Sequence, residues 1–312
     1  MTSGKRPRQI GHWAEEDAVG TEGHCSTVAP SKRIRIGVQL STWGPERIGQ
    51  GLNRVLDEVA ATGCEGVEIG VRYLDLAAPE TLRPVLKRTG LHLIACMRLL
   101  YLYDESLIPR YAEELKQAAW FANTLGANFI TIGTIRKKEG RPTPTDISCA
   151  VKVLEAAGRV CRAEGIPLLY HNYAIAAHTG EIERICAEAD PALVDIALDI
   201  GWYTKGGGDF YDFYSHWRDR VKYVHFKDHK SYQTAYPIGA GNVGYESILR
   251  RLLDTGYRGW GTIELEKLPG TRESWEAMDE DITHQPFPDP QDGVSRSVLW
   301  LNQTLAKLEG RT

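Results

Sequence analysis

The sequence predicts an α/β chain that folds as a single-domain (β/α)8 barrel, the TIM-barrel fold. Three observations lead to this prediction. Eight short segments rich in apolar or β-branched residues recur from residue 34 onward, and a stretch of helical length follows each of them. Their spacing is roughly 32 residues, which is the length of one strand and one crossover helix in such a barrel. Glycines also stand just before several of these segments, where helix ends are expected.

The eight segments are the predicted barrel strands. In chain order they are RIGVQL, EGVEIG, LHLIACM, NFITIG, IPLLYH, VDIALD, VKYVHF and GTIELE, which begin near residues 35, 65, 91, 128, 166, 194, 221 and 261. The glycines expected to end the preceding helices in the left-handed conformation are Gly63, Gly90, Gly126, Gly165 and Gly256. An open doubly wound sheet is the alternative, but it needs a phosphate-binding turn such as GxGxxG, which QLSTWGPERIGQG after the first strand does not supply.

The domain organisation follows from the same pattern. Residues 1–32 mix charged residues, Gly and Ser without apolar periodicity, so we expect a flexible N-terminal extension ahead of a barrel over residues 33–312. Two connections are long: residues 231–242 after the seventh strand and residues 267–293 after the eighth. Loops of this length in a compact domain often bind ligands, and both would lie on the catalytic face of the barrel.

Composition excludes several classes of function. The chain has 312 residues, a net charge of −4 and no long basic run, so neither nucleic acid nor a membrane surface is an expected partner. No stretch reaches the ~18 apolar residues of a membrane span, and the N-terminus lacks the apolar core of a signal peptide. The six cysteines are scattered without CxxC pairs, which indicates buried reduced thiols and a cytoplasmic protein.

Three ionisable residues mark the ends of the last three predicted strands. Asp199 ends the sixth, His225 lies near the end of the seventh, and Glu264 near the end of the eighth. Adjacent strands lie ~4.8 Å apart, so inward-pointing side chains can converge on one ion. Two carboxylates and one imidazole suit Mn²⁺, Zn²⁺, Co²⁺, Fe²⁺ or Mg²⁺. The alternative is that each residue has a separate structural role, as a helix cap, a core histidine and an ion-pair partner.

Several segments around these residues resemble a known family. They are YHNY at 170–173, ALDIGWYTKGGGDF at 197–210, RVKYVHFKD at 220–228, GAGNVGYESIL at 239–249 and GYRGWGTIELE at 256–266. From about residue 34 to the C-terminus, the chain is similar to the xylose-isomerase-like sugar phosphate isomerases and epimerases, a group that includes inosose dehydratases, ketose 3-epimerases and hydroxypyruvate isomerases. The resemblance implies one divalent metal, with Mn²⁺ favoured, held by Asp199, His225 and Glu264, and a sugar or cyclitol substrate.

The fifth strand departs from the family pattern. Relatives usually place a metal-binding Glu there, whereas this chain has His171, and no carboxylate follows in AIAAH. His171, His178 or water remain as candidates for the fourth ligand position. We predict His171, which is also a candidate catalytic residue; the alternative is a core histidine bonded to Asn172 or to a backbone carbonyl. Trp202 stands where many relatives carry a His, and can stack on a sugar face.

Further residues are candidates for catalysis or substrate binding. Glu68 ends the second predicted strand, and Glu266 lies two residues beyond Glu264 on the same strand face, so both could reach the pocket as a base or as acceptors of substrate hydroxyls. Glu264 is a further candidate for the base. The alternative is that Glu68 and Glu266 are solvated or paired with loop residues. Lys227 could hold a substrate oxyanion or form a surface salt bridge. Trp43 after the first strand stands where relatives place an aromatic wall, so the resemblance implies that role. Arg98 at the end of the third strand is the candidate cation for a substrate carboxylate or phosphate.

The chemistry that fits is proton transfer on a carbon next to a carbonyl. A Lewis-acidic ion stabilises an enediolate, and return of the proton gives an isomerase or epimerase. A dehydratase or lyase acting on a keto-sugar or inosose is the alternative within the same site. A DNA-repair endonuclease needs more His ligands and a basic groove, and a non-catalytic barrel remains open because the usual strand-five Glu is missing. The sequence also leaves the oligomeric state open, a homo-oligomer included.

Overall fold

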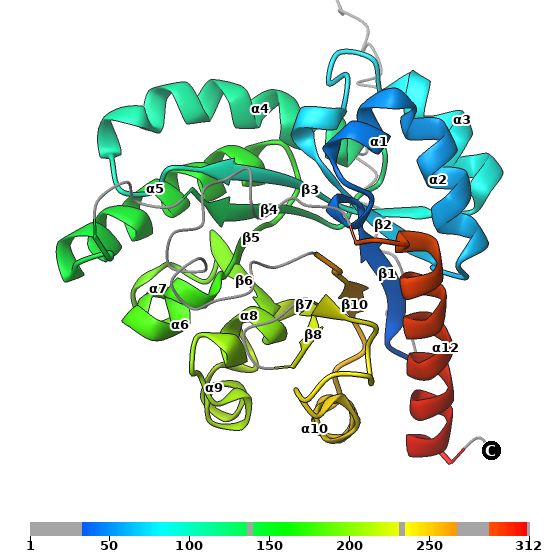
Figure 1. Ribbon diagram of the computed structural model, residues 1–312. Coiled ribbons are helices and arrows are strands. Elements are labelled where there is room, and N and C mark those ends of the chain that lie inside the picture. Colours follow the sequence, from blue (N-terminus) through cyan, green and yellow to red (C-terminus); the bar gives the residue numbers. More distant parts are fainter. Residues whose placement is uncertain (1–32, 136–139, 231–234, 267–286, 311–312) are drawn as a thin grey trace, which may run out of the picture.

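The computed structural model describes residues 33–135, 140–230, 235–266 and 287–310, and these form a closed barrel of eight parallel strands (Figure 1). Around the barrel, the strands are ordered β1-β10-β7-β6-β5-β4-β3-β2. They are β1 (Arg35–Gln39), β2 (Gly66–Gly70), β3 (His92–Leu100), β4 (Phe129–Thr134), β5 (Leu168–His171), β6 (Val194–Asp199), β7 (Val221–Phe226) and β10 (Trp260–Ile263). The predicted (β/α)8 barrel is therefore confirmed.

Helices occupy the connections between the strands and lie outside the barrel (Figure 1). They are α1 (Pro45–Gln50), α2 (Leu52–Ala61), α3 (Pro79–Thr89), α4 (Ile108–Thr124), α5 (Pro144–Ala163), α6 (Ala174–Thr179), α7 (Glu181–Glu188), α8 (Ile200–Lys205), α9 (Phe210–Trp217), α10 (Tyr245–Asp254) and α12 (Pro290–Leu308). Short 3-10 helices span Leu40–Trp43, Val71–Tyr73 and Glu105–Leu107. All five glycines predicted to end helices have positive φ, between 71° and 84°. Such a φ is strained for residues with a Cβ, which explains glycine there.

The structure differs from the predicted boundaries at the end of the chain. Strand β10 ends at Ile263, so Glu264 directly follows the strand instead of lying within it. Helix α12 begins at Pro290, inside the predicted loop 267–293, because Asp289 caps its N-terminus by accepting from the Asp292 N–H. The predicted extension over residues 1–32 and most of that loop lie outside the described residues.

The connection after β7 is anchored on Asp228. It contains a two-stranded antiparallel sheet of β8 (Asp228–His229) and β9 (Ala235–Tyr236). One oxygen of Asp228 accepts from the backbone N–H groups of Gly239 and Gly241, both at 2.9 Å. A Cβ on Gly241 would lie 2.1 Å from the other oxygen, so only glycine fits this close approach. The carboxylate thereby holds the turn of this connection against the end of β7.

Apolar side chains pack together near the amino ends of several strands, and polar side chains gather toward the carboxyl ends. A separate apolar cluster of buried residues consists of Ile94, Ala95, Leu169, Ala197, Tyr223 and Trp260. At the amino ends of the strands, His92 stacks on Trp260 with ring centroids 5.4 Å apart, and the Arg35 guanidinium lies 3.8 Å from the Trp260 ring centroid. These side chains cover the amino end, whereas the polar residues considered below lie at the carboxyl ends of the strands.

Two predictions from composition can be compared with the described residues. Among the helices placed there, none is both long and apolar enough to cross a bilayer. Four cysteines are buried free thiols, whereas Cys149 is half-buried and Cys25 lies outside the described ranges; the four are Cys64, Cys96, Cys161 and Cys186. Buried reduced thiols are thus confirmed at four positions.

Candidate metal centre

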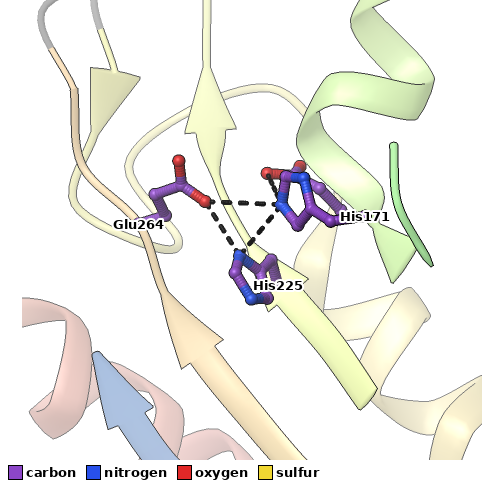
Figure 2. A group of neighbouring side chains, drawn as sticks. His171, His225 and Glu264 are labelled. Carbon is purple, nitrogen blue, oxygen red and sulfur yellow. Dashed lines mark hydrogen bonds and ion pairs between the residues drawn. The ribbon is translucent and has the colours of Figure 1, made fainter. Parts of the chain in front are cut away.

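Four side chains from four neighbouring strands converge at the carboxyl end of the barrel. His171 ends β5, Asp199 ends β6, His225 lies in β7, and Glu264 follows β10. The barrel places these strands side by side, and Asp199 pairs with His225 in the register of β6 and β7. One potential ligand atom from each residue lies within 4.8 Å of the others. We call these four residues the ligand cluster; Figure 2 shows the imidazoles of His171 and His225 and the carboxylate of Glu264 turned toward one another.

The separations within the ligand cluster fit a single small cation. His171 Nε2 lies 3.3 Å from His225 Nδ1 and 3.8 Å from both Asp199 Oδ2 and Glu264 Oε2. His225 Nδ1 lies 2.8 Å from Glu264 Oε2. Ligand atoms about 2.0–2.2 Å from a tetrahedral ion are roughly 3.3–3.6 Å apart, so small adjustments would suffice.

An unsatisfied oxygen supports the same interpretation. Asp199 is fully buried, and its Oδ2 atom accepts no hydrogen bond in the described part of the chain. A buried carboxylate oxygen that accepts no hydrogen bond is costly, and a divalent cation would satisfy it. Two imidazole nitrogens and two carboxylate oxygens form a donor set that suits first-row divalent metals. The residues present therefore fit the metal that the sequence predicts.

Contacts on the other atoms hold two of the ligands in orientation. Asp199 caps α8, since its Oδ1 accepts from the Trp202 N–H at 2.6 Å, which leaves Oδ2 for the cluster. Glu264 Oε1 accepts from Lys227 Nζ at 3.0 Å, which leaves Oε2 for the cluster. Asn172 accepts from the Asp199 N–H at 2.8 Å and donates to its carbonyl at 3.1 Å, so it fixes the end of β6. The helix cap foreseen as an alternative role for Asp199 thus coexists with membership of the cluster.

Burial and charge shift the pKa values around the cluster. Burial alone would raise the pKa of Glu264, but the positive charge of Lys227 and the hydrogen bonds of His171 and His225 hold it well below the usual range. Burial raises the pKa of Glu266 to about 8, with Lys227 opposing the shift and Glu264 adding to it. Burial would lower the pKa of Lys227, yet the surrounding carboxylates raise it, so this lysine is charged.

The structure brings four more of the predicted site residues to the cluster. Lys227 Nζ lies 2.9 Å from Glu266 Oε2 and 4.2 Å from the centroid of the Trp202 ring. Glu68 Oε2 lies 2.7 Å from His225 Nε2, the imidazole nitrogen that does not face the cluster. Lys227 is fully buried, so the surface salt bridge considered as an alternative is wrong.

Three other candidates have partners outside the cluster. The indole N–H of Trp43 donates to Glu58 in α2 at 2.8 Å. Arg98 points toward α4 and forms an ion pair with Glu114 at 2.8 Å, because its place in β3 alternates with the inward-facing residues. His178 is exposed on α6 and contacts Arg141. The structure therefore does not bring Trp43, Arg98 or His178 to the ligand cluster.

Sequence reasoning missed two neighbours of the cluster. The ring of Tyr173 packs edge-on against His171, with centroids 5.3 Å apart, and against Trp202 at 5.9 Å. Lys205, near the end of α8, lies 5.6 Å from the Trp202 ring centroid, and burial lowers its pKa to about 7. The signal that could have identified Tyr173 is its position two residues after His171, which places it on the same side of the chain.

The molecule is a (β/α)8 barrel with a candidate metal centre. Two imidazoles and two carboxylates lie buried together at the carboxyl ends of four of the barrel strands. The chain belongs to the family of xylose isomerase-like TIM barrels, whose model matches residues 56–286. The resemblance noted from the sequence motifs is therefore confirmed.

Several proteins similar to this chain are enzymes that act on sugars or on inosose. The inosose dehydratase of Geobacillus kaustophilus is 25% identical over 274 residues, which cover 76% of this chain and 88% of that protein. The D-allulose 3-epimerase of Methylomonas sp., solved in complex with D-allulose, superposes with a TM-score of 0.69 at 18% identity, covering 88% of this chain and 99% of that one. The 3-keto-D-glucoside 4-epimerase of E. coli superposes with a TM-score of 0.66 at 17% identity, covering 87% and 100%. The two solved structures corroborate the fold.

Proposed function

We propose that this protein is a metal-dependent isomerase or epimerase of a sugar or cyclitol, which moves a proton on a carbon next to a carbonyl. The observation that carries the proposal is the ligand cluster, His171, Asp199, His225 and Glu264, with the buried Lys227–Glu266 ion pair directly beside it. When bound there, a divalent ion would act as a Lewis acid that polarises the substrate carbonyl. Among the candidate metals, Mn²⁺ is our first choice because the set includes two hard carboxylate oxygens.

Glu266 is the base in this proposal. It follows Glu264 by two residues on the same face of the chain, so its carboxylate reaches the site without being needed in the ligand cluster. Lys227 holds this carboxylate at 2.9 Å and keeps it oriented. Glu266 takes the proton from the carbon next to the carbonyl and, for isomerisation, returns it to the neighbouring carbon. Epimerisation also requires delivery of a proton to the opposite face of the same carbon, which Glu266 alone does not supply. Glu264 and His171 remain ligands, although the sequence also suggested catalytic roles for them.

Lys227 and Trp202 position the substrate. The Lys227 ammonium lies between the two glutamates, where it can donate a hydrogen bond to the oxygen on which negative charge develops. The Trp202 ring lies against the ammonium and is fully buried, so it offers an apolar wall for a sugar face and keeps water from the charged groups. Glu68, Trp43 and Arg98 take no part in substrate binding in this proposal, because their polar groups are engaged elsewhere.

Proton exchange tests this function. The metal-loaded enzyme is incubated with ketoses, inososes and 3-keto-sugars in deuterated water, and mass spectrometry detects deuterium uptake at carbon. We expect uptake for at least one substrate class, loss of uptake after chelation, and recovery with Mn²⁺. A protein that binds no divalent metal, or that exchanges equally well without one, would contradict the proposal and favour the non-catalytic barrel.

A dehydratase acting on an inosose or keto-sugar is the second candidate. The observation that favours it is the similarity to the inosose dehydratase of Geobacillus kaustophilus over 76% of this chain. The first step is the same proton removal, after which a β-hydroxyl leaves as water. The same incubations separate the two candidates, because a dehydratase gives a product lighter by one water whereas an epimerase conserves the mass.

A further inference from the structure

Glu68 lies inside the barrel, below the ligand cluster. It is fully buried in β2, and three groups surround its carboxylate. Thr131 donates a hydrogen bond to Oε1, while Tyr223 donates to Oε2 at 2.9 Å. His225 Nε2 lies 2.7 Å from Oε2. Because these three groups surround the carboxylate, we do not expect it to contact a substrate.

The two ring nitrogens of His225 face different groups on opposite sides of the ring. Nδ1 lies in the ligand cluster, 2.8 Å from Glu264 Oε2 and 3.3 Å from His171 Nε2. Nε2 lies on the other side of the ring, next to Glu68. A metal-binding imidazole must offer a lone pair at one nitrogen and then carries its proton on the other. The position of that proton therefore decides whether His225 can act as a ligand.

We propose that Glu68 is a positioning residue that holds the His225 proton on Nε2, so that the lone pair of Nδ1 points into the ligand cluster. This inference rests on the metal-dependent function proposed above. A carboxylate is suited to the task because its negative charge favours the tautomer that donates to it, and because metal-bound histidines commonly donate their second N–H to such a group. Glu68 thus acts on the metal through His225, without contact to the substrate.

A chain of hydrogen bonds fixes Glu68 in turn. Tyr223 can use its single O–H proton on only one acceptor. Its hydroxyl lies 2.5 Å from Thr262 Oγ1 as well as 2.9 Å from Glu68, so Thr262 donates to Tyr223 and Tyr223 donates to the carboxylate. Together with Thr131, this gives the buried carboxylate two hydrogen-bond donors in addition to the ion-pair contact with His225, which offsets much of the cost of its burial. The barrel interior is therefore built to keep a charged group behind His225.

The test compares two buried glutamates that are both bonded to tyrosines. Glu68→Gln keeps the shape of the side chain and removes its charge. Glu181→Gln is the matched control, because Glu181 is also fully buried and accepts from Tyr103 and Tyr170, but it is not part of the ligand cluster. Metal-free parent and variants are titrated with Co²⁺ against a competing chelator, and the visible spectrum of the Co²⁺ complex is recorded.

We expect Glu68→Gln to weaken Co²⁺ binding by about 10–100-fold and to change the Co²⁺ spectrum, as is typical when the partner of a ligating histidine is lost. Glu181→Gln should retain the parent affinity and spectrum. Parent affinity and an unchanged spectrum in Glu68→Gln would overturn the inference while leaving the metal-dependent function intact. A parent protein that binds no metal would overturn the proposed function itself.

A measurement on the parent protein covers the case in which Glu68→Gln does not fold. ¹⁵N NMR of the histidines in the Zn²⁺-loaded parent reports which imidazole nitrogen of His225 is protonated. We expect the proton on Nε2 and the metal on Nδ1. A proton on Nδ1 would refute the positioning role of Glu68, whatever the behaviour of the variants.

Discussion

The ammonium group of Lys227 and the carboxylate of Glu266 form a buried ion pair, with Nζ 2.9 Å from Oε2. The same nitrogen lies 3.0 Å from Glu264 Oε1 and 3.8 Å from Asp199 Oδ2. One cation therefore faces three buried carboxylates, two of which belong to the ligand cluster. Since uncompensated buried charges are strongly destabilising, Lys227 balances the charge of the site as well as orienting Glu266.

Removal of this cation should destabilise the metal-free protein. We expect Lys227→Met to lower the free energy of unfolding by about 3–5 kcal/mol, because the carboxylates around it lose their counter-charge. Urea denaturation at neutral pH, followed by circular dichroism, measures the change. Lys152→Met is the control: this lysine pairs with Glu105 at 2.9 Å on the surface, where the expected loss is below ~1 kcal/mol. Equal losses in the two variants would contradict the charge-balancing role.

Glu266→Gln should separate catalysis from metal binding. The amide cannot take a proton, so we expect the deuterium exchange rate of the substrate found in the screen to fall by about 100-fold or more. Metal affinity should stay within a few-fold of the parent, because Glu266 is not in the ligand cluster. Isothermal titration with Mn²⁺ and the exchange assay measure the two quantities. A variant that exchanges protons at the parent rate would exclude Glu266 as the base.

The unusual fifth strand gives a further prediction. His171→Ala should weaken metal affinity by about tenfold or more, since a lost ligand costs at least as much as the lost partner of a ligand. His178→Ala is the control, because this exposed histidine on α6 lies outside the ligand cluster. Titration with Mn²⁺ against a competing chelator gives both affinities. The reverse result, a loss with His178→Ala alone, would make His178 the fourth ligand.

The sequence predicted the strands and the cluster because both depend on local pattern. Apolar periodicity and helix-ending glycines gave the barrel, and the place of Asp199 and His225 at strand ends followed from it. The role of Glu68 could not be predicted, because it depends on a 2.7 Å contact across the barrel with a residue 157 positions away in the chain. The direction of Arg98 was missed for a related reason: the register between β2 and β3 shifts near Glu68, which changes the residues of β3 that point inward.

Glu181 provides a test of the pKa pattern away from the site. Burial raises the pKa of this carboxyl group, although hydrogen bonds from Tyr170 and Tyr103 oppose the shift. The folded state therefore binds the proton more tightly than the unfolded state. The stabilisation linked to this proton is complete below the unfolded pKa of about 4.3 and is lost as the pH rises through the folded value.

The expected result is a pH-dependent difference between the parent and Glu181→Gln, which has no proton to lose. From pH 5 to pH 8, the free energy of unfolding of the parent should fall relative to that of the variant, as measured by urea denaturation of the metal-free proteins. Tyr103→Phe is a second check: it removes a donor to the ionised carboxylate, so the fall with pH should become larger than in the parent. If the free energy of unfolding of the parent stays constant or rises with pH relative to that of Glu181→Gln, the carboxyl group does not bind its proton more tightly in the folded state.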